Sequence, residues 1–117
     1  MDRKAVIRYI EEMYGVVYER PWADSPENYV FRHQGNRKWF AIAMQVAKNK
    51  IGLPGEEKID IMNVKCEKEM IPALLATEGY FSAYHMNKAN WITFVLDDRL
   101  PDETMINLID LSFELTR

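Results

Sequence analysis

Residues 37–47 read Arg-Lys-Trp-Phe-Ala-Ile-Ala-Met-Gln-Val-Ala, and this stretch decides the fold. A bulky apolar residue stands at every second position: Phe40, Ile42, Met44 and Val46. A period of two predicts a β-strand, because successive side chains of a strand point to opposite faces of a sheet. We expect the bulky set to face the helices. The other set, mostly small residues around Trp39, is then expected to form the second face.

Three more strands are predicted around this one. Residues 29–33 form the first, joined to it by the tight turn 34–36, where Gly and Asn tolerate positive φ. Residues 58–64 form another, with Ile59 and Ile61 in alternation, and residues 91–96 are rich in strand-forming types. The segments expected to be loops or only weakly extended are 20–28, 49–57 and 79–86.

Three helices are predicted: residues 2–14, residues 67–76, and a last helix that begins at Pro101. Asp2 suits the N-cap of the first helix, and Gly15 suits the left-handed residue that follows its end. Pro72 indicates that the second helix is kinked or begins later. The expected buried sides are Val6, Ile10 and Met13 in the first helix, and Met105, Leu108, Ile109 and Phe113 in the last.

The order of these elements is helix, hairpin, strand, helix, strand, helix. It favours an α+β fold with an antiparallel sheet of four or five strands. We expect residues 37–47 to be central, with the first and last helices packed together on one face. A chain of 117 residues fits a single domain, residues 1–117.

Charge is unevenly distributed along the chain. The net charge of −3 argues against a strongly basic nucleic-acid binder. From Tyr29 to Gly55, however, there are five cations and no acids, so a local basic surface is expected. The single Cys66 cannot form an intramolecular disulfide, and neither a signal peptide nor an apolar run of about 20 residues is visible. These features predict a cytoplasmic protein that does not bind a membrane.

Several stretches resemble the MmcQ/YjbR family. Tyr84-His85-Met86-Asn87-Lys88, two residues before Trp91, is similar to the family's Tyr-His-Met-Asn-Lys-x-x-Trp signature. Lys65-Cys66-Glu67 resembles the segment that opens its middle helix, and Ser112-Phe113-Glu114-Leu115 resembles its closing Ser-Tyr-Glu-Leu. Val30-Phe31-Arg32 and Lys38-Trp39-Phe40-Ala41 fit its N-terminal hairpin.

The resemblance implies a CyaY-like α+β fold that covers nearly the whole chain. By analogy with a double-wing arrangement of hairpins, it also implies a DNA-binding role. One position departs from the family pattern. The residue before the tryptophan is often His in the family and is Asn90 here, which argues against a site that needs two imidazoles at this place.

The segment His85-Met86-Asn87-Lys88 is the first candidate site. His85 and Lys88 could donate to phosphate oxygens while Asn87 orients them, with Trp91 stacking on a base. The alternative is a structural role, in which Asn87 and His85 satisfy backbone groups of an irregular turn and Trp91 belongs to the core.

The basic hairpin of residues 29–50 is the second candidate site. In the functional interpretation Arg32, Arg37 and Lys38 straddle phosphates, and Trp39 inserts or stacks. In the structural interpretation these side chains form a solvated hairpin tip, because edge strands often carry charge that prevents aggregation.

Enzyme and metal sites are not indicated by the sequence. His33, His85 and Cys66 match no metal-ligand spacing, and no glycine-rich phosphate loop is present. Lys65 and Lys68 flank Cys66 and could lower the pKa of its thiol, but a small packed residue at a helix start is the simpler interpretation.

We therefore predict a non-enzymatic, monomeric protein without cofactor or metal that binds DNA weakly and without sequence preference. The alternative is a protein–protein adaptor or a module for a small anionic ligand, using the face around Trp39 and His85. One continuous basic patch would favour DNA, whereas a concave pocket around Trp22 and Trp39 with His85 at its rim would favour a ligand. The predicted DNA contacts are Arg32, Arg37, Lys38, Trp39, Lys48, Lys50, His85, Asn87 and Lys88.

Overall fold

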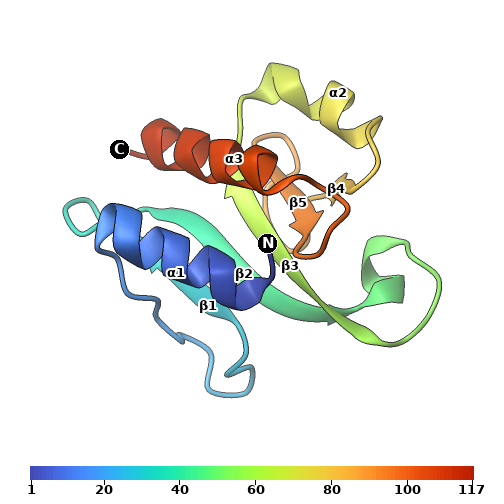
Figure 1. The fold of residues 1–117 in the computed structure, drawn as a ribbon, viewed down its shortest axis with the longest axis horizontal. Coiled ribbons are helices and arrows are strands. Elements are labelled where there is room, and N and C mark those ends of the chain that lie inside the picture. Colours follow the sequence, from blue (N-terminus) through green and yellow to red (C-terminus); the bar gives the residue numbers. More distant parts are fainter.

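A five-stranded antiparallel sheet organises the molecule, with strand order β1-β2-β3-β5-β4 (Figure 1). The structure is a computed structural model that describes residues 1–117. None of its helices has both the length and the apolar character needed to cross a bilayer. The strands are β1 (Tyr29–Arg32), β2 (Trp39–Ala47), β3 (Lys58–Lys65), β4 (Tyr80–Ser82) and β5 (Trp91–Val95). The helices are α1 (Arg3–Tyr14), α2 (Ile71–Leu75) and α3 (Asp102–Leu115), with single 3₁₀ turns at Lys48–Ile51 and Lys68–Met70.

The α+β class and the antiparallel sheet predicted from the sequence are confirmed. The weakly extended segment 79–86 supplies a fifth strand at the sheet edge, β4, so β3 occupies the middle of the sheet. The second helix begins later than residue 67, with Pro72 in its first turn, where a missing N–H is harmless. In the β1–β2 turn, positive φ lies at Arg37 rather than at the expected Gly35 or Asn36.

Helices α1 and α3 lie side by side over one face of the sheet (Figure 1). The hydroxyl groups of Tyr9 and Tyr14 on α1 both donate to the Asp110 carboxylate of α3. Burial and this carboxylate raise the pKa of both tyrosines, that of Tyr9 to about 12, so both keep their protons as donors. Tyr14 also stacks on Phe113, with ring centroids 3.9 Å apart.

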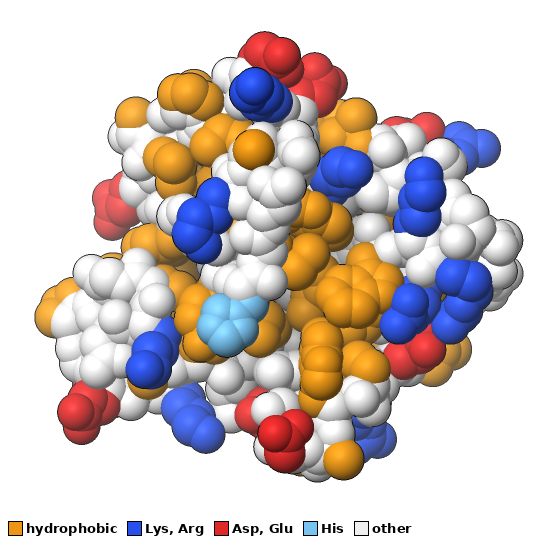
Figure 2. Space-filling model, turned by 180° about the vertical axis from the view of Figure 1, so that it is seen from behind, with side chains coloured by type: hydrophobic (Ala, Val, Ile, Leu, Met, Phe, Trp, Pro, Cys, Tyr) orange, Lys and Arg blue, Asp and Glu red, His pale blue; other side chains and the backbone are white.

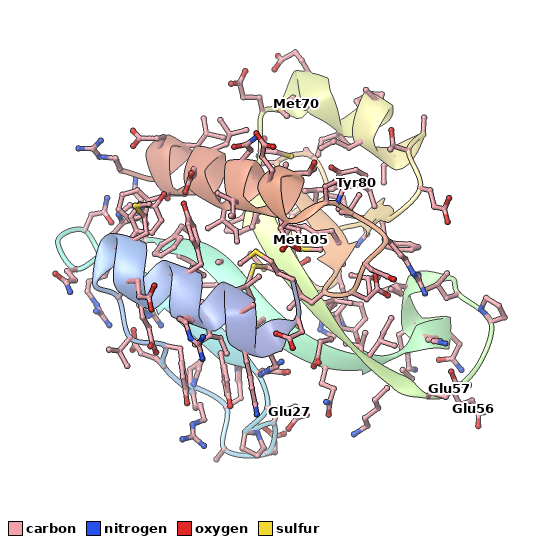
Figure 3. All side chains as sticks on the ribbon, in the orientation of Figure 1. Glu27, Glu56, Glu57, Met70, Tyr80 and Met105 are labelled. Atoms are coloured by element: carbon pink, nitrogen blue, oxygen red, sulfur yellow. The ribbon has the colours of Figure 1, made fainter.

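The predicted buried stripe of α1 is correct for Val6 and Ile10 and wrong for Met13. Met13 is 57% exposed. Tyr14 takes its place, because α3 lies on the side of α1 that carries Tyr9 and Tyr14. On α3, Met105, Leu108 and Ile109 are buried as predicted, and Phe113 is half-buried against the core. Met105 and Tyr80 lie in the layer between helices and sheet (Figure 3).

A β-bulge at Phe40 interrupts the period of two in β2. Phe31 pairs with Ala41 and Arg32 pairs with Trp39, so Phe40 has no partner on β1. In such a bulge two residues of one strand oppose one of the other, and the alternation of faces shifts by one position. Phe40 and Ala41 accordingly both belong to the helix-side core.

The bulge makes the predicted face assignment of β2 wrong for three of its four bulky residues. Only Phe40 faces the helices, together with the small Ala41 and Ala43. Beyond the bulge, the other bulky residues project from the opposite face, on the same side as Trp39. They are Ile42, Met44 and Val46. The sheet therefore has an apolar layer on both faces, and one of these layers is not covered by α1 or α3.

The Ser112 side chain of α3 stabilises this bulge. Its hydroxyl donates to the Phe40 carbonyl at 2.6 Å and accepts from the Lys65 backbone N–H at 2.9 Å. The register of β2 with β3 begins only at Ala41, paired with Val64, so these two backbone groups lie just beyond the ladder. A single buried hydroxyl supplies the hydrogen bonds that the sheet omits.

His33 is the buried histidine of the helix-side core. Its Nε2 lies 2.7 Å from the Thr116 hydroxyl oxygen, and its ring packs against Phe113 and Phe40. Burial lowers the pKa of His33 below its usual value, because the charged imidazolium would lose its hydration. His33 is therefore a neutral structural residue at neutral pH.

Replacing Ser112 with Ala should destabilise the protein by about 2–4 kcal/mol, because it leaves two buried backbone groups without partners. Chemical denaturation would measure the change in the free energy of unfolding. Ser82→Ala in β4 is the matched control, since Ser82 is exposed, and it should stay within about 0.5 kcal/mol of the wild type. Equal, small losses in both variants would contradict the role of Ser112.

Stability should fall on acidification from about pH 6.5 toward pH 5, because the unfolded state, with its ordinary imidazole pKa, binds a proton more readily than buried His33 does. The melting temperature measured across this range should drop in the wild type and in a His85→Gln control, which keeps His33. The drop should be smaller in His33→Phe. An identical pH profile in His33→Phe would show that another group is responsible.

Candidate functional site

The candidate site lies on the sheet face that α1 and α3 leave uncovered. Hydrophobic side chains gather in the middle of this face beside a histidine, while Lys and Arg side chains stand mostly toward its margins (Figure 2). The buried layer consists of Val30, Ile42, Met44, Val46, Ile61 and Val95. Two loops rather than helices cover it, so part of the layer is accessible from outside.

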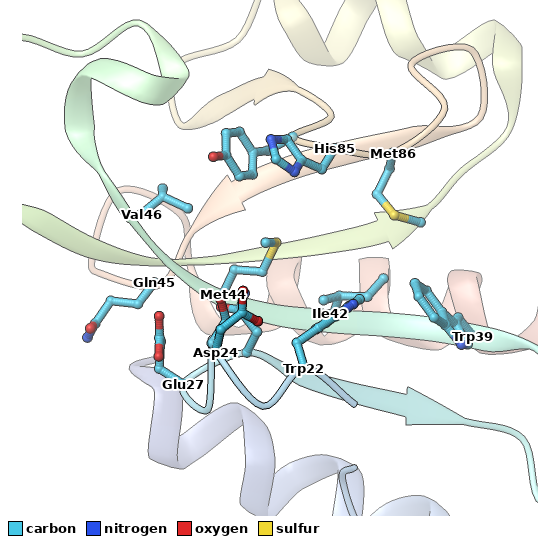
Figure 4. A pocket seen from close by; sticks show the side chains of 13 residues that line it. Trp22, Asp24, Glu27, Trp39, Ile42, Met44, Gln45, Val46, His85 and Met86 are labelled. Atoms are coloured by element: carbon cyan, nitrogen blue, oxygen red, sulfur yellow. The ribbon is translucent and has the colours of Figure 1, made fainter. Parts of the chain in front are cut away.

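A cavity of about 490 Å³ opens between these two loops, and we call it the sheet-face pocket (Figure 4). Its floor is the outer face of β2, from Ile42 to Val46. One wall is the loop 22–28, and the other is the segment Tyr84–Met86. The lining residues are Trp22, Asp24, Ser25, Glu27, Asn28, Trp39, Ile42, Met44, Gln45, Val46, Tyr84, His85 and Met86.

The first wall is fixed at both ends of its loop. Glu19 and Val30 form an antiparallel bridge with N···O distances of 2.9 Å, which ties the entry of the loop to β1. The Arg3 guanidinium donates to the Glu27 carbonyl and lies over the Tyr29 ring. The loop is therefore held against the sheet edge, although it contains no regular secondary structure.

The second wall is attached to the sheet through the main chain of Tyr84. The Tyr84 N–H donates to the Thr93 hydroxyl at 3.0 Å, and the Tyr84 carbonyl accepts from Asn63 Nδ2, also at 3.0 Å. The Thr93 hydroxyl in turn donates to Asn63 Oδ1. Asn63 and Thr93 are paired in register on β3 and β5, and both are fully buried. This polar pair satisfies both backbone groups of Tyr84.

His85 stands at the rim of the pocket, which is the arrangement that favours the ligand alternative. Its backbone has φ 58°, a left-handed conformation that reverses the chain after β4. Its exposed ring stacks on Tyr84 with centroids 4.1 Å apart. Met86 follows and extends toward the β2 side of the cavity (Figure 4).

The remaining residues of the His-Met-Asn-Lys segment make internal contacts. The Lys88 ammonium donates to the Ala83 carbonyl at 2.6 Å. Asn87 accepts from the Ala89 N–H through its side chain at 2.9 Å and from the Trp91 N–H through its carbonyl at 3.0 Å. Asn87 thus satisfies backbone groups of the turn, as the structural alternative proposed, whereas the second residue that does so is Lys88 and not His85. Neither Asn87 nor Lys88 lines the pocket.

Acidic neighbours neutralise much of the predicted basic hairpin. Glu19 pairs with both Arg32, at 3.1 Å, and Arg37, at 2.9 Å. The Arg32 guanidinium also lies 5.3 Å from the centre of the Trp39 ring. Lys38 is exposed and forms no ion pair.

Lys48 and Lys50 lie far from this hairpin tip. They follow the end of β2, whereas Arg37 and Lys38 precede its start. A strand rises about 3.3 Å per residue, so β2 separates the two groups by roughly 25 Å. Lys48 pairs with Glu57 at 2.7 Å and lowers the pKa of that carboxyl. The cations of residues 29–55 therefore do not form one patch.

Trp22, Trp39 and His85 are the residues of the alternative site expected from the sequence, and the structure brings these three residues to one cavity. Ile42, Met44 and Val46 were not expected at this site, because the bulge that turns them toward the pocket has no signal in the local sequence pattern.

Cys66 is buried, and burial together with Glu67 raises the pKa of its thiol, opposite to the reactive-cysteine alternative. No group of three His, Cys, Asp or Glu side chains could hold a metal ion.

Comparison with known proteins shows what this chain is similar to. The sequence model of the YjbR family matches residues 11–115. The uncharacterised protein YyaQ of Bacillus subtilis is 37% identical over 117 residues, which cover 100% of this chain and 99% of YyaQ.

Solved structures share the fold. A Pseudomonas syringae protein is 38% identical, and its crystal structure superposes with a TM-score of 0.98 over 100% of both chains. Its solution structure gives a TM-score of 0.90 over 100% of this chain and 94% of that one. The Deinococcus radiodurans protein DR2400, at 20% identity, gives a TM-score of 0.74 over 97% of this chain and 77% of its own, which shows a shared fold.

Thr93→Val should loosen the second wall of the pocket, because it removes the hydroxyl that accepts the hydrogen bond of the Tyr84 N–H and donates to Asn63. The Tyr84 amide should exchange with deuterium at least about tenfold faster, and stability should fall by about 1–3 kcal/mol. Hydrogen exchange followed by NMR measures the first effect. Thr104→Val on α3 is the control, since the Thr104 hydroxyl forms no hydrogen bond. An unchanged rate of hydrogen exchange at the Tyr84 amide would show that the Thr93 hydroxyl does not hold this wall.

Proposed function

The chain belongs to the YjbR family, and we propose that it is a small-molecule-binding protein whose ligand occupies the sheet-face pocket. The observation that carries this proposal is the cavity of about 490 Å³ over an apolar floor with polar groups at its walls. Ligand sites are usually concave, mostly apolar and largely preformed, with a few polar groups that orient the ligand.

The size and lining of the cavity support this proposal. Its volume falls within the range of roughly 300–1,000 Å³ that is typical of ligand pockets. Ile42, Met44 and Val46 provide the floor, and Trp22 and Trp39 pack edge to face at one end with centroids 5.8 Å apart. Tryptophan side chains offer a large apolar contact area with a geometry suited to flat ligands.

The walls also have the rigidity that such a function requires. One is bridged to β1 and held by Arg3, and the other is clamped by Asn63 and Thr93. A pocket that is already formed loses little conformational entropy on binding, so more of the contact energy contributes to affinity.

Nonspecific DNA binding stays a prediction with less support. Arg32 and Arg37 share Glu19, Lys48 pairs with Glu57, and Lys88 donates to the Ala83 carbonyl. A phosphate contact made by any of these four cations would have to displace one of these interactions. Lys38 and Lys50 have no such partner but lie beyond opposite ends of β2.

An NMR titration with a panel of small aromatic compounds of positive, zero and negative charge tests the pocket. Members of the panel should bind with dissociation constants of about 1 mM or tighter and shift the amide signals of Trp22, Trp39 and the Tyr84–Met86 segment. Met44→Trp fills the cavity floor and should weaken this binding about tenfold or more. Val17→Trp adds the same side chain at an exposed position and should not.

Two results would contradict the proposal. The first is an absence of saturable shifts at these amides with every compound of the panel. The second is binding that Met44→Trp and Val17→Trp affect equally. A parallel anisotropy titration with a short DNA duplex at several salt concentrations tests the DNA alternative, whose affinity should fall with salt by a slope of about −0.9 per phosphate contacted.

A further inference from the structure

We propose that the ligand of the sheet-face pocket is an organic cation, a primary ammonium or guanidinium group attached to an apolar or aromatic body. This inference rests on the proposed ligand-binding function and adds the charge and hydrogen-bonding character of the ligand. Its basis is a wall that presents hydrogen-bond acceptors without a matching positive charge, next to an apolar floor.

Two carboxylates of this wall are free. Asp24 is exposed and Glu27 is half-buried, and neither side chain takes part in an ion pair or a hydrogen bond within the protein. Both extend from the loop toward the part of β2 that carries Met44 and Gln45 (Figure 4). The pocket therefore has negative charge at one side of its opening.

A third acceptor lies deeper in the same wall. Asn28 is 9% exposed and lines the cavity, and its Oδ1 is buried without a hydrogen-bond partner. Buried carbonyl oxygens in proteins nearly always accept a hydrogen bond, so this atom lacks the donor that such an oxygen normally has. An ammonium group carries three donors and no acceptor, and a guanidinium carries five.

No Lys or Arg side chain lines the pocket to oppose this charge. Arg3, behind the loop, is occupied by the Glu27 carbonyl, by Asp60 at 3.5 Å and by the Tyr29 ring. A ligand carboxylate or phosphate would find two free carboxylates and no fixed cation. This charge distribution disfavours the small anionic ligand expected from the sequence.

The floor and the second wall of the pocket suit the apolar or aromatic body of such a cation. Met44 and Met86 place polarisable thioethers on either side of the cavity, and Trp22 and Trp39 close one end. Aromatic rings attract cations and also pack against the alkyl or aryl groups that a cation carries. A bare metal ion fits less well, because Asp24 and Glu27 are not part of any group of three metal-ligating side chains.

Three probes with the same phenylethyl body test this inference: 2-phenylethylamine, 2-phenylethanol and 3-phenylpropionate. In NMR titrations of the full chain at pH 7, the amine should bind about tenfold more tightly than the alcohol, because its hydrogen bonds to carboxylates are charge-assisted. The propionate should bind most weakly. All three should shift the same pocket amides, since they share one body.

The double variant Asp24→Asn with Glu27→Gln should lose the preference for the amine and keep its affinity for the alcohol. Glu11→Gln with Glu12→Gln is the matched control, because it changes the net charge equally at two exposed positions of α1. The control should keep the preference. A preference that survives in the first double variant, or is lost in the control, would refute the proposed role of Asp24 and Glu27.

The two proposals fail in different ways. Equal affinity for all three probes at the pocket amides, or tighter binding of the propionate, would overturn the cation proposal and leave the ligand-binding function standing. Absence of binding by all three probes, together with the rest of the aromatic panel, would overturn both. Amine binding that shifts only amides remote from the pocket would also overturn the cation proposal.

Discussion

The hydroxyl of Ser112 is the interaction on which the arrangement of this sheet depends. By bonding both the Phe40 carbonyl and the Lys65 N–H, it satisfies backbone groups of β2 and β3 just beyond their last pair, Ala41 and Val64, at the residue that bulges from the β1–β2 ladder. A bulge without such a partner would leave polar groups buried and unpaired, at a cost that a short sheet cannot easily offset. The same contact joins α3 to the sheet, so helix packing and strand register are coupled.

The pocket follows from that register. With Phe40 as the extra residue, Trp39 and the bulky residues after the bulge project from one face, while the small Ala41 and Ala43 meet the helices. The helices can then approach the sheet closely, and the bulky side chains become the floor of a cavity on the other side. Asn63 and Thr93 on the neighbouring strands hold the second loop above that floor. One irregularity in one strand thus separates the helix-side core from the residues that line the pocket.

The distribution of charge along the sequence differs from the distribution of charge on the folded surface. The acid-free stretch of residues 29–55 looks basic along the sequence, yet Glu19 and Glu57 reach its cations from outside that stretch. Asp24 and Glu27, which precede it, remain unpaired at the pocket. The sheet-face pocket therefore carries accessible negative charge, although the stretch 29–55 that supplies its floor has an excess of positive charge in the sequence. The charge of a sequence stretch predicts the charge of its surface only where folding brings no oppositely charged side chains from elsewhere in the chain.

The sequence alone determined the four longer strands, the first and last helices, the antiparallel α+β class, the Asp2 cap and the Gly15 helix end, because these depend on neighbours a few residues away. It also placed Trp22, Trp39 and His85 on one possible face. The tertiary structure decided which face each residue of β2 occupies, which cations stay free, and that Tyr14 rather than Met13 is packed. Each of these depends on a partner far along the chain: Ser112 lies 72 residues beyond Phe40, and no local pattern encodes such a contact.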